Sequence, residues 1–281
     1  MDFLYLLVAI WLLVASFLDL KYREIPNWLS FSMAAFGLSY AAFRSGLELD
    51  LWPFLFSLFG FALFFLIAYA LYYGRVFAGG DAKLLIGLGP LLPQFSGLGL
   101  NFSFMFLYIL LVLVVGGVYG LGYSFFVAIL NRKKFVHGFL EEINFKRVGI
   151  FLALASLPAI LSLVLWEPLF LFFSCLLFIF PFLLSYSKAI EKCMVIEKNV
   201  ENLSVGDWLE ESVKAGDKEI GPGWEGLSEK EIKILGKERD SVKVKDGIPF
   251  VPSFLFAFLI LIYLRNSSWF VDYFWLLRFL F

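Results

Sequence analysis

Residues 1–19 read MDFLYLLVAIWLLVASFLD and contain no charged side chain between Asp2 and Asp19. A helix that crosses the hydrocarbon core of a bilayer needs about 20 mostly apolar residues, so this stretch is long enough for one crossing. The pattern recurs along the chain and indicates a membrane protein. Long apolar runs follow at residues 28–43, 51–73, 103–130, 149–166, 168–187 and 250–264, and a shorter one at 84–93 is either a half-length helix or the start of a kinked span.

The composition supports the same fold class. The chain has 281 residues, of which 61% are hydrophobic and only 17% are charged. A soluble protein of this length would need more charge to cover its surface. We therefore predict an α-helical polytopic membrane protein with about six to eight transmembrane helices and a small α/β cytosolic insertion. The first run is expected to stay in the protein, because it begins with the acidic Asp2 rather than with the basic residues of a signal peptide.

Several classes of site are excluded by residue content. The single histidine, His137, lies in a basic stretch, so a metal site built on histidines is not expected. Cys175 and Cys193 are interpreted as unpaired thiols. The net charge is −1, and no basic patch with interleaved aromatic residues indicates nucleic-acid binding. The sequence predicts neither a metal nor a cofactor.

The distribution of Lys and Arg predicts the orientation. The connections at residues 19–27, 74–83 and 131–148 are rich in Lys and Arg, whereas those on the opposite side carry one basic residue, Arg44. Cytoplasmic loops carry the excess of positive charge, so the first set is placed in the cytosol and the N-terminus outside. We expect a multi-pass protein of the cell membrane, with the lipid bilayer as its surroundings.

Charge also predicts three domains. Residues 1–187 form the membrane helical domain, residues 188–248 a charged cytosolic domain, and residues 249–281 the last transmembrane helix with an interfacial tail. Residues 188–247 contain 11 Lys or Arg and 14 Asp or Glu. Within them, Ser228 with Glu231 three residues later predicts a capped helix, and SVKVKDG alternates as a strand does.

Two aspartates stand at the edges of apolar runs. Asp19 ends the first run, and Asp81 follows Gly79 and Gly80 at the start of the short one. A charge at the centre of a span costs about 2.5–3.5 kcal/mol, so such carboxylates call for an explanation. The glycines are expected to allow positive φ and close approach of a neighbouring segment. Taken singly, Asp81 is explained as a helix cap and Asp19 as a boundary charge.

Together the two aspartates indicate chemistry. The predicted topology brings both to the cytosolic face, and two carboxylates in a semi-apolar site share one proton. The ionised carboxylate can then act as a general base on water while the protonated one polarises a peptide carbonyl. This is the chemistry of aspartic proteases, and it requires no metal. Spacing alone leaves this hypothesis open.

Two motifs carry a resemblance to a known family. DLKYREIPN at residues 19–27 and AGGDAKLLIGLGPLLP at residues 78–93 resemble the archaeal branch of the type IV prepilin peptidases, which includes the preflagellin peptidases. Members of this GxGD-type family carry one aspartate at the end of the first helix, before an Ile-Pro-Asn-like stretch. They carry a second in a Gly-x-Gly-Asp motif followed by lysine. This chain departs from the motif at Ala78, which replaces the first glycine.

The resemblance implies a site and a function. It assigns Asp19 and Asp81 as the catalytic pair, with Gly79, Gly80 and Lys83 in support. It implies a membrane aspartic endopeptidase that removes a short basic leader peptide from pilin-like or archaellin-like precursors at the cytosolic membrane face. The strong resemblance covers about the first 95 residues, with a looser likeness in DGIPFVPSFL at residues 246–255. The apolar pair at 149–187 looks additional, which leaves the choice between pilin and archaellin precursors open.

Other readings remain at this point. An intramembrane protease of the presenilin type would place its aspartates deeper in the spans. An ion- or proton-coupled membrane transporter would use Asp19 and Asp81 as an ion site. A structural membrane subunit would need neither aspartate.

Lys83 is either an ion-pair partner of Asp81 or a side chain that reaches toward the headgroups. The oligomeric state is not predicted.

Overall fold

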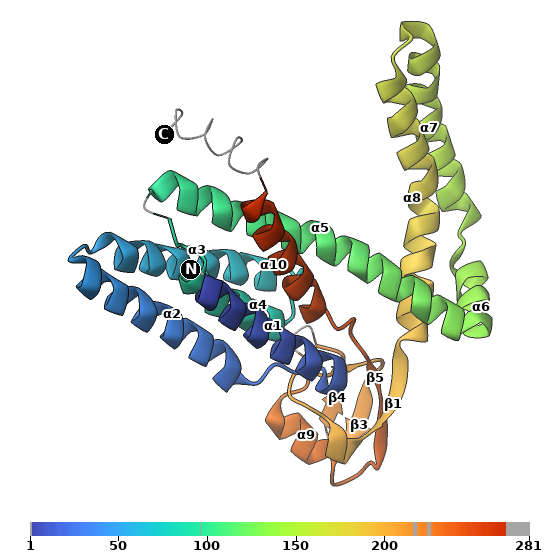
Figure 1. Ribbon diagram of the computed structural model, residues 1–281. Helices are drawn as coiled ribbons and strands as arrows, with labels where there is room; N and C mark the ends of the chain where they lie inside the picture. The colour runs from blue at the N-terminus through green and yellow to red at the C-terminus, as the bar shows by residue number, and fades with distance from the viewer. Residues whose placement is uncertain (1, 96, 216–217, 224–225, 268–281) are drawn as a thin grey trace. The chain divides into compact units, whose positions relative to one another are not determined.

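The computed structural model describes residues 2–95, 97–215, 218–223 and 226–267 (Figure 1). It consists of two compact units. The first is Met1–Leu121 with Pro249–Phe281, and the second is Gly122–Ile248. The predicted boundaries at residues 188 and 249 stay a prediction, and the predicted interfacial tail beyond residue 267 lies outside the described residues.

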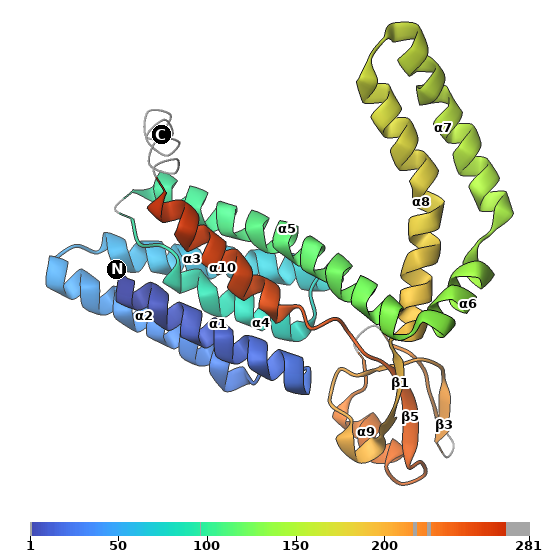
Figure 2. The same cartoon turned by 45° about the vertical axis from the view of Figure 1, so that its right-hand side comes forward.

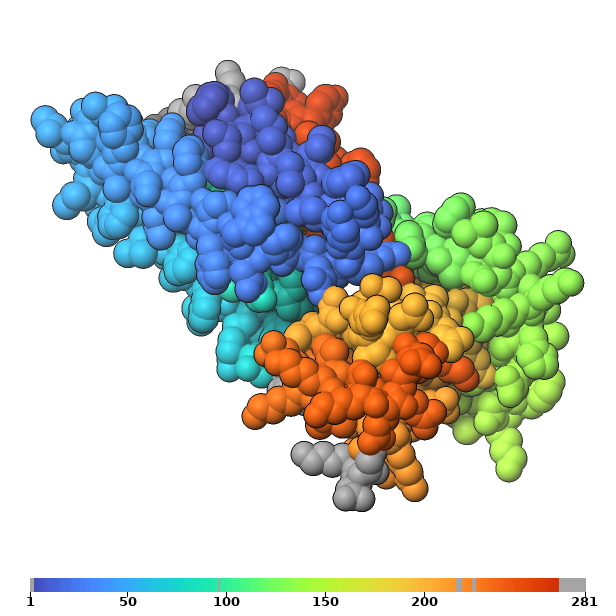
Figure 3. All heavy atoms as spheres, turned by 90° about the horizontal axis from the view of Figure 1, so that it is seen from below, coloured from blue at the N-terminus to red at the C-terminus, as the bar shows by residue number. Residues whose placement is uncertain are grey.

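The first unit is helical. Its helices are α1 (Asp2–Tyr22), α2 (Asn27–Glu48), α3 (Trp52–Tyr73), α4 (Gly79–Leu88), the start of α5 (Leu98–Leu130) and α10 (Val251–Asn266), with a 3₁₀ turn at Gly89–Leu91. Figures 1 and 2 show α10 beside α1, two helices from opposite ends of the chain that pack together. In Figure 3, atoms of α2 lie beside those of α1. Their shared core includes the fully buried Phe64, Tyr108 and Phe254.

The helices are those of a membrane protein. Five of the described helical stretches are long and apolar enough to cross a bilayer: Phe3–Tyr22, Trp52–Tyr73, Leu98–Leu130, Phe145–Leu165 and Pro168–Cys193. A shorter apolar helix, Val251–Asn266, accompanies them. Large apolar side chains such as Leu13 and Phe17 on α1 are about 60% exposed, as lipid contact would require. The predicted fold class, a polytopic helical membrane protein with a small α/β insertion, is confirmed.

The short apolar run forms a half-length helix held between two longer ones. A Cβ atom at Gly87 of α4 would lie 2.8 Å from the Ser30 carbonyl oxygen of α2, so only glycine allows this approach. On the other side, Ser57 Oγ of α3 donates a hydrogen bond of 2.8 Å to the Pro90 carbonyl oxygen. Because α4 is fixed against both α2 and α3, the position of its first turn is set by the core.

The second unit combines helices with two small sheets. Its helices are α6 (Arg132–Glu142), α7 (Phe145–Leu165), α8 (Pro168–Cys193) and α9 (Glu229–Leu235), and α7 and α8 pack against each other (Figure 2). The larger sheet has the order β1-β5-β2 and is antiparallel, with Val195 opposite Lys245. The strands are β1 (Val195–Asn199), β2 (Trp208–Leu209), β3 (Val213–Ala215), β4 (Lys218–Ile220) and β5 (Ser241–Lys245), and β3 pairs with β4.

Two predictions for this unit are confirmed. The helix α9 begins after Ser228, whose N–H donates a hydrogen bond of 2.7 Å to Glu231 Oε2, while Glu231 N–H donates to Ser228 Oγ. This reciprocal pair is the predicted capping box. The sequence SVKVK forms strand β5, whose alternate residues Val242 and Val244 are buried in the core of the unit.

The basic connection at residues 131–148 differs from its expected loop form. Most of it forms helix α6, and His137 lies exposed on that helix. Lys, Arg, Leu and Glu are good helix formers, and the helix gains packing because Gly138 lies against Ala189 of α8. Lys192 of α8 also pairs with Glu142 at 2.9 Å. The helix therefore results from contacts that the local sequence pattern does not reveal.

Candidate active site

Asp19 lies in the last turn of α1 and points into the first unit. Its side chain is buried, at 8% exposure. One carboxylate oxygen, Oδ2, accepts a hydrogen bond of 3.0 Å from the backbone N–H of Val251, the first residue of α10. A carboxylate at the C-terminal end of a helix faces the negative end of that helix's dipole. The N–H at the positive end of α10 offsets this unfavourable position.

Asp81 is the third residue of α4 and is equally buried, at 8% exposure. Its Oδ2 accepts a hydrogen bond of 3.2 Å from the backbone N–H of Ala78, which precedes the helix. This is half of a capping box, because Ala78 has no side-chain oxygen to accept from the helix in return. Asp81 is thus fixed by its own helix start.

The two carboxylates interact electrostatically. Asp81 lies in a ten-residue helix outside the five candidate spans. Burial, followed by the negative charge of Asp19, raises the pKa of Asp81 to about 7, against the opposing hydrogen bond from Ala78. The structure therefore brings the two predicted residues, from separate helices, within electrostatic reach of each other. A pair of this kind holds one proton near neutral pH.

The two glycines before Asp81 act differently from the prediction. Both are the first residues of helix α4, and the left-handed backbone that turns the chain occurs at Arg75, with φ of 59°. The expected positive φ at the glycines is therefore wrong. Close approach is confirmed for Gly80, where a Cβ atom would lie 3.3 Å from Ile25 Cδ1. At Gly79 the nearest atom would be 3.7 Å away, on Tyr72.

The side chain of Lys83 bonds to helix α2, and an ion pair with Asp81 was one of its two predicted roles. Its Nζ donates a hydrogen bond of 2.8 Å to Asn27 Oδ1, at the first residue of α2. This contact links α4 to α2 close to both aspartate segments. The observed partner indicates a role in holding these helices together, and it does not support the reading of Lys83 as the counter-ion of Asp81.

Residues at the start of α10 were missed by the sequence analysis as parts of the site. Val251 contributes a backbone N–H, which has no side-chain signature. The Phe250 and Phe254 rings pack on Phe77, with centroids 5.5 and 5.6 Å apart, and Phe77 is four residues before Asp81. Two signals pointed to this segment: the looser likeness to the family in DGIPFVPSFL at residues 246–255, and Pro252, which marks a helix start.

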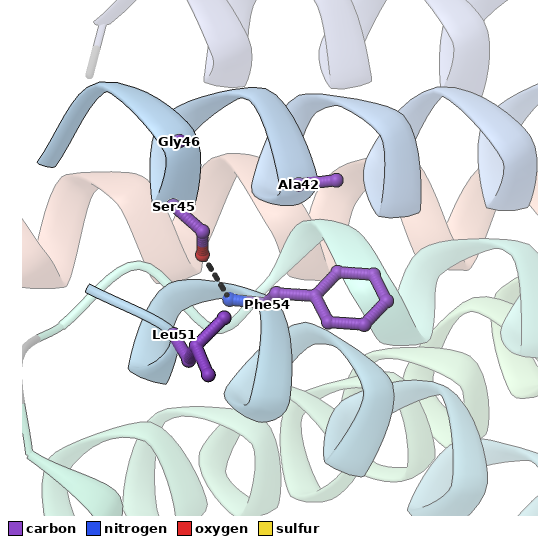
Figure 4. Close-up of a pocket in the computed structure, with 5 residues that line it drawn as sticks. All are labelled: Ala42, Ser45, Gly46, Leu51 and Phe54. Carbon is purple, nitrogen blue, oxygen red and sulfur yellow. Dashed lines mark hydrogen bonds between the residues drawn. The ribbon is translucent and has the colours of Figure 1, made fainter. Parts of the chain in front are cut away.

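A metal-binding cluster and the pocket at the α2–α3 turn are the two alternatives to the aspartate pair that the described residues allow us to assess. No group of three or more His, Cys, Asp or Glu that could hold a metal occurs among them. Figure 4 shows a pocket at the turn between α2 and α3, where Ser45 Oγ accepts a hydrogen bond of 3.0 Å from the Phe54 N–H. Its lining residues, Ala42, Ser45, Gly46, Leu51 and Phe54, carry no titratable side chain. The pocket lies at the end of α2 far from Asn27.

Fold and site together define a polytopic helical membrane protein with two buried, interacting carboxylates on separate helices. Residues 6–121 match the type IV leader peptidase family, and this segment contains both aspartates. The predicted resemblance to the archaeal type IV prepilin and preflagellin peptidases is thereby confirmed over residues 6–121.

Curated relatives agree with the family match. The chain is 36% identical over 92 residues to the preflagellin peptidase of Methanococcus maripaludis, covering 33% of this chain and 40% of the relative. It is 40% identical over 88 residues to the preflagellin peptidase of Methanocaldococcus jannaschii, covering 31% and 37%. It is 29% identical over 158 residues to the prepilin peptidase EppA of Methanothermobacter thermautotrophicus, covering 52% and 41%. The match thus spans about two fifths of each relative's length.

Proposed function

We propose that this chain is a membrane aspartic endopeptidase that removes a short basic leader peptide from pilin-like or archaellin-like precursors. The observation that carries the proposal is the burial of Asp19 and Asp81 in one unit, with the charge of Asp19 contributing to the raised pKa of Asp81. The family match over residues 6–121 supports a peptidase, and it lends no support to the transporter alternative.

The pair supplies both proton transfers that peptide hydrolysis needs. The ionised carboxylate takes a proton from a water molecule, whose oxygen then attacks the scissile carbonyl carbon. The protonated carboxyl donates to the carbonyl oxygen as the tetrahedral intermediate forms. When this intermediate collapses, the C–N bond breaks and the departing nitrogen receives the proton that was taken from water. The hydroxyl formed from the carbonyl oxygen returns its proton to the carboxylate that donated it. Neither a metal nor a cofactor takes part in this sequence.

The substrate class follows from the relatives and from the orientation. The relatives are named preflagellin peptidase and prepilin peptidase, which supports precursors of these two kinds as substrates. The excess of Lys and Arg in the loops next to Asp19 and Asp81 supports a cytosolic site. A leader that precedes a hydrophobic helix would meet the pair at that membrane face.

A reconstituted assay tests the proposal. The purified protein is placed in vesicles without any ion gradient, together with a precursor that has a basic leader before an apolar segment. Mass spectrometry then follows the loss of the leader. Cleavage that continues with a chelator and without a gradient supports an aspartic peptidase. Gradient-dependent ion uptake without cleavage of either precursor type would overturn it. Asp50→Asn is the matched control for the Asp19→Asn and Asp81→Asn variants, because Asp50 lies exposed in the α2–α3 turn.

A further inference from the structure

The start of α10 contacts both aspartate-bearing segments. The Val251 N–H donates to Asp19 Oδ2 at 3.0 Å, in a buried position. The neighbouring ring of Phe250 packs on Phe77, which precedes the Asp81 helix. One short segment therefore joins α1 to the α3–α4 connection, although it lies more than 160 residues beyond Asp81 in sequence.

The Val251 amide is available because of how α10 begins. The first N–H groups of a helix have no intrahelical acceptor. Pro252 has no N–H, and the Ser253 N–H bonds back to the Phe250 carbonyl oxygen at 3.0 Å. The Val251 N–H is thus the first-turn donor that reaches Asp19. This bond restrains the orientation of the Asp19 carboxylate.

The Phe250 ring occupies a notch in α5. Gly116 is buried, and a Cβ atom built there would overlap the far end of the Phe250 ring. By contrast, a Cβ atom at Gly120, one turn further along the same helix, would meet nothing within 4 Å. Gly116 therefore makes room for the ring, which also packs against Phe77 and Phe254. A methyl group at position 116 would therefore displace the ring.

We infer that Phe250 and Val251 form a positioning element for the aspartate pair, seated in the Gly116 notch, which holds the Asp19 carboxylate at the angle that hydrolysis requires. The inference rests on the proposed function and names a further part of its site. Neither residue is assigned contact with the substrate. A misplacement of a reacting group by about 1 Å can cost about 100-fold in rate, so seating of the ring should affect turnover.

The test compares single methyl additions on one helix. Gly116→Ala is expected to lower kcat at least about tenfold with KM within about twofold, because the displaced ring shifts the Val251 amide. Gly120→Ala is the matched control and should retain wild-type kinetics. The double variant Gly116→Ala with Phe250→Leu, which shortens the clashing side chain, should recover most of kcat. Equal kinetics for Gly116→Ala and Gly120→Ala would overturn the inference.

A second measurement keeps the inference separate from the proposed function. The infrared difference between wild type and Asp19→Asn isolates the Asp19 carboxyl band without any need for cleavage. Replacing the Val251 amide by an ester removes the N–H donor and also weakens the Phe250 carbonyl oxygen as the acceptor of the Ser253 N–H. This change should shift the band, as should Gly116→Ala. An unchanged band in both proteins would refute the positioning element. Failure of the wild type to cleave any precursor would instead refute the proposed function. The band shift would still test whether the Val251 N–H contacts the Asp19 carboxylate.

Discussion

The backbone N–H of Val251 donates a hydrogen bond of 3.0 Å to Asp19 Oδ2, joining the last described helix to the first across 232 positions of sequence. The bond places the positive end of one helix dipole at a carboxylate that sits on the negative end of another. Asp81 accepts a hydrogen bond from the Ala78 N–H at the start of α4, and the negative charge of Asp19 contributes to its raised pKa. From this arrangement several measurable consequences follow for catalysis and stability.

Activity should fall in alkaline solution. The pKa of Asp81 is about 7, so the proton shared by the pair is lost as the pH rises through this value. The account predicts that kcat declines about tenfold per pH unit above the pKa, because the protonated member is needed to polarise the carbonyl. Steady-state cleavage between pH 5 and 9 measures the effect, with Gly120→Ala as a folding control. A rate that stays flat up to pH 9 would contradict the assigned role of the proton.

The free energy of unfolding should also decrease as the pH rises. The pKa of Asp81 in the folded protein, about 7, lies above the ordinary value of 3.8, so the folded protein binds more protons than the unfolded chain between these two pH values. The contribution of this group is therefore fully present below about pH 4 and is lost as the pH rises through about 7. Asp81→Asn stays neutral and can still accept from the Ala78 N–H. Its Tm in detergent at pH 8 should equal or exceed that of wild type, and a clearly lower value would argue against the raised pKa.

Lys83 should contribute modestly to both stability and activity. Its ammonium bonds to Asn27 at an exposed position, and such a hydrogen bond contributes about 1 kcal/mol or less to stability. Lys83→Met is predicted to reduce kcat less than about tenfold. In a double-mutant cycle with Asn27→Ala the two changes should couple, because they remove the same bond. Complete loss of activity in Lys83→Met, with normal folding, would restore its interpretation as a partner of Asp81.

The sequence patterns predicted those features that are local. The long apolar helices, the Ser228 capping box and strand β5 each follow from neighbouring residues, and so do Asp19 and Asp81 as candidates. The contact from Val251 could not be predicted, because a backbone donor has no residue type and its partner lies 232 positions away. Gly116 was one of several small residues on a helix face, and only its contact with Phe250 distinguishes it. Positive φ was predicted at Gly79 and Gly80 but occurs at Arg75. Residue type alone could not predict this, because φ also depends on tertiary packing.

The packing of α4 provides a stability test. A methyl group at Gly87 would approach the Ser30 carbonyl oxygen to 2.8 Å, closer than a Cβ atom normally comes. Gly87→Ala should therefore destabilise the first unit by about 1–3 kcal/mol, as overpacking usually does. Gly117→Ala is the comparison, since a Cβ atom there would meet nothing within 4 Å. Thermal unfolding of the purified variants in detergent measures both. Equal Tm values would show that α4 can shift away from α2 without cost.

The central claim is that Asp19 and Asp81 together perform the hydrolysis. The most direct measurement is single-turnover cleavage of a leader-bearing precursor by wild type, Asp19→Asn and Asp81→Asn, each at equal protein level in membranes. Asparagine keeps the size of the side chain and an acceptor oxygen, so folding should survive. The account predicts that wild type cleaves and that each single variant loses at least about 1,000-fold in rate, because either change removes one of the two proton transfers. Cleavage by either variant at a rate near that of wild type would contradict the claim.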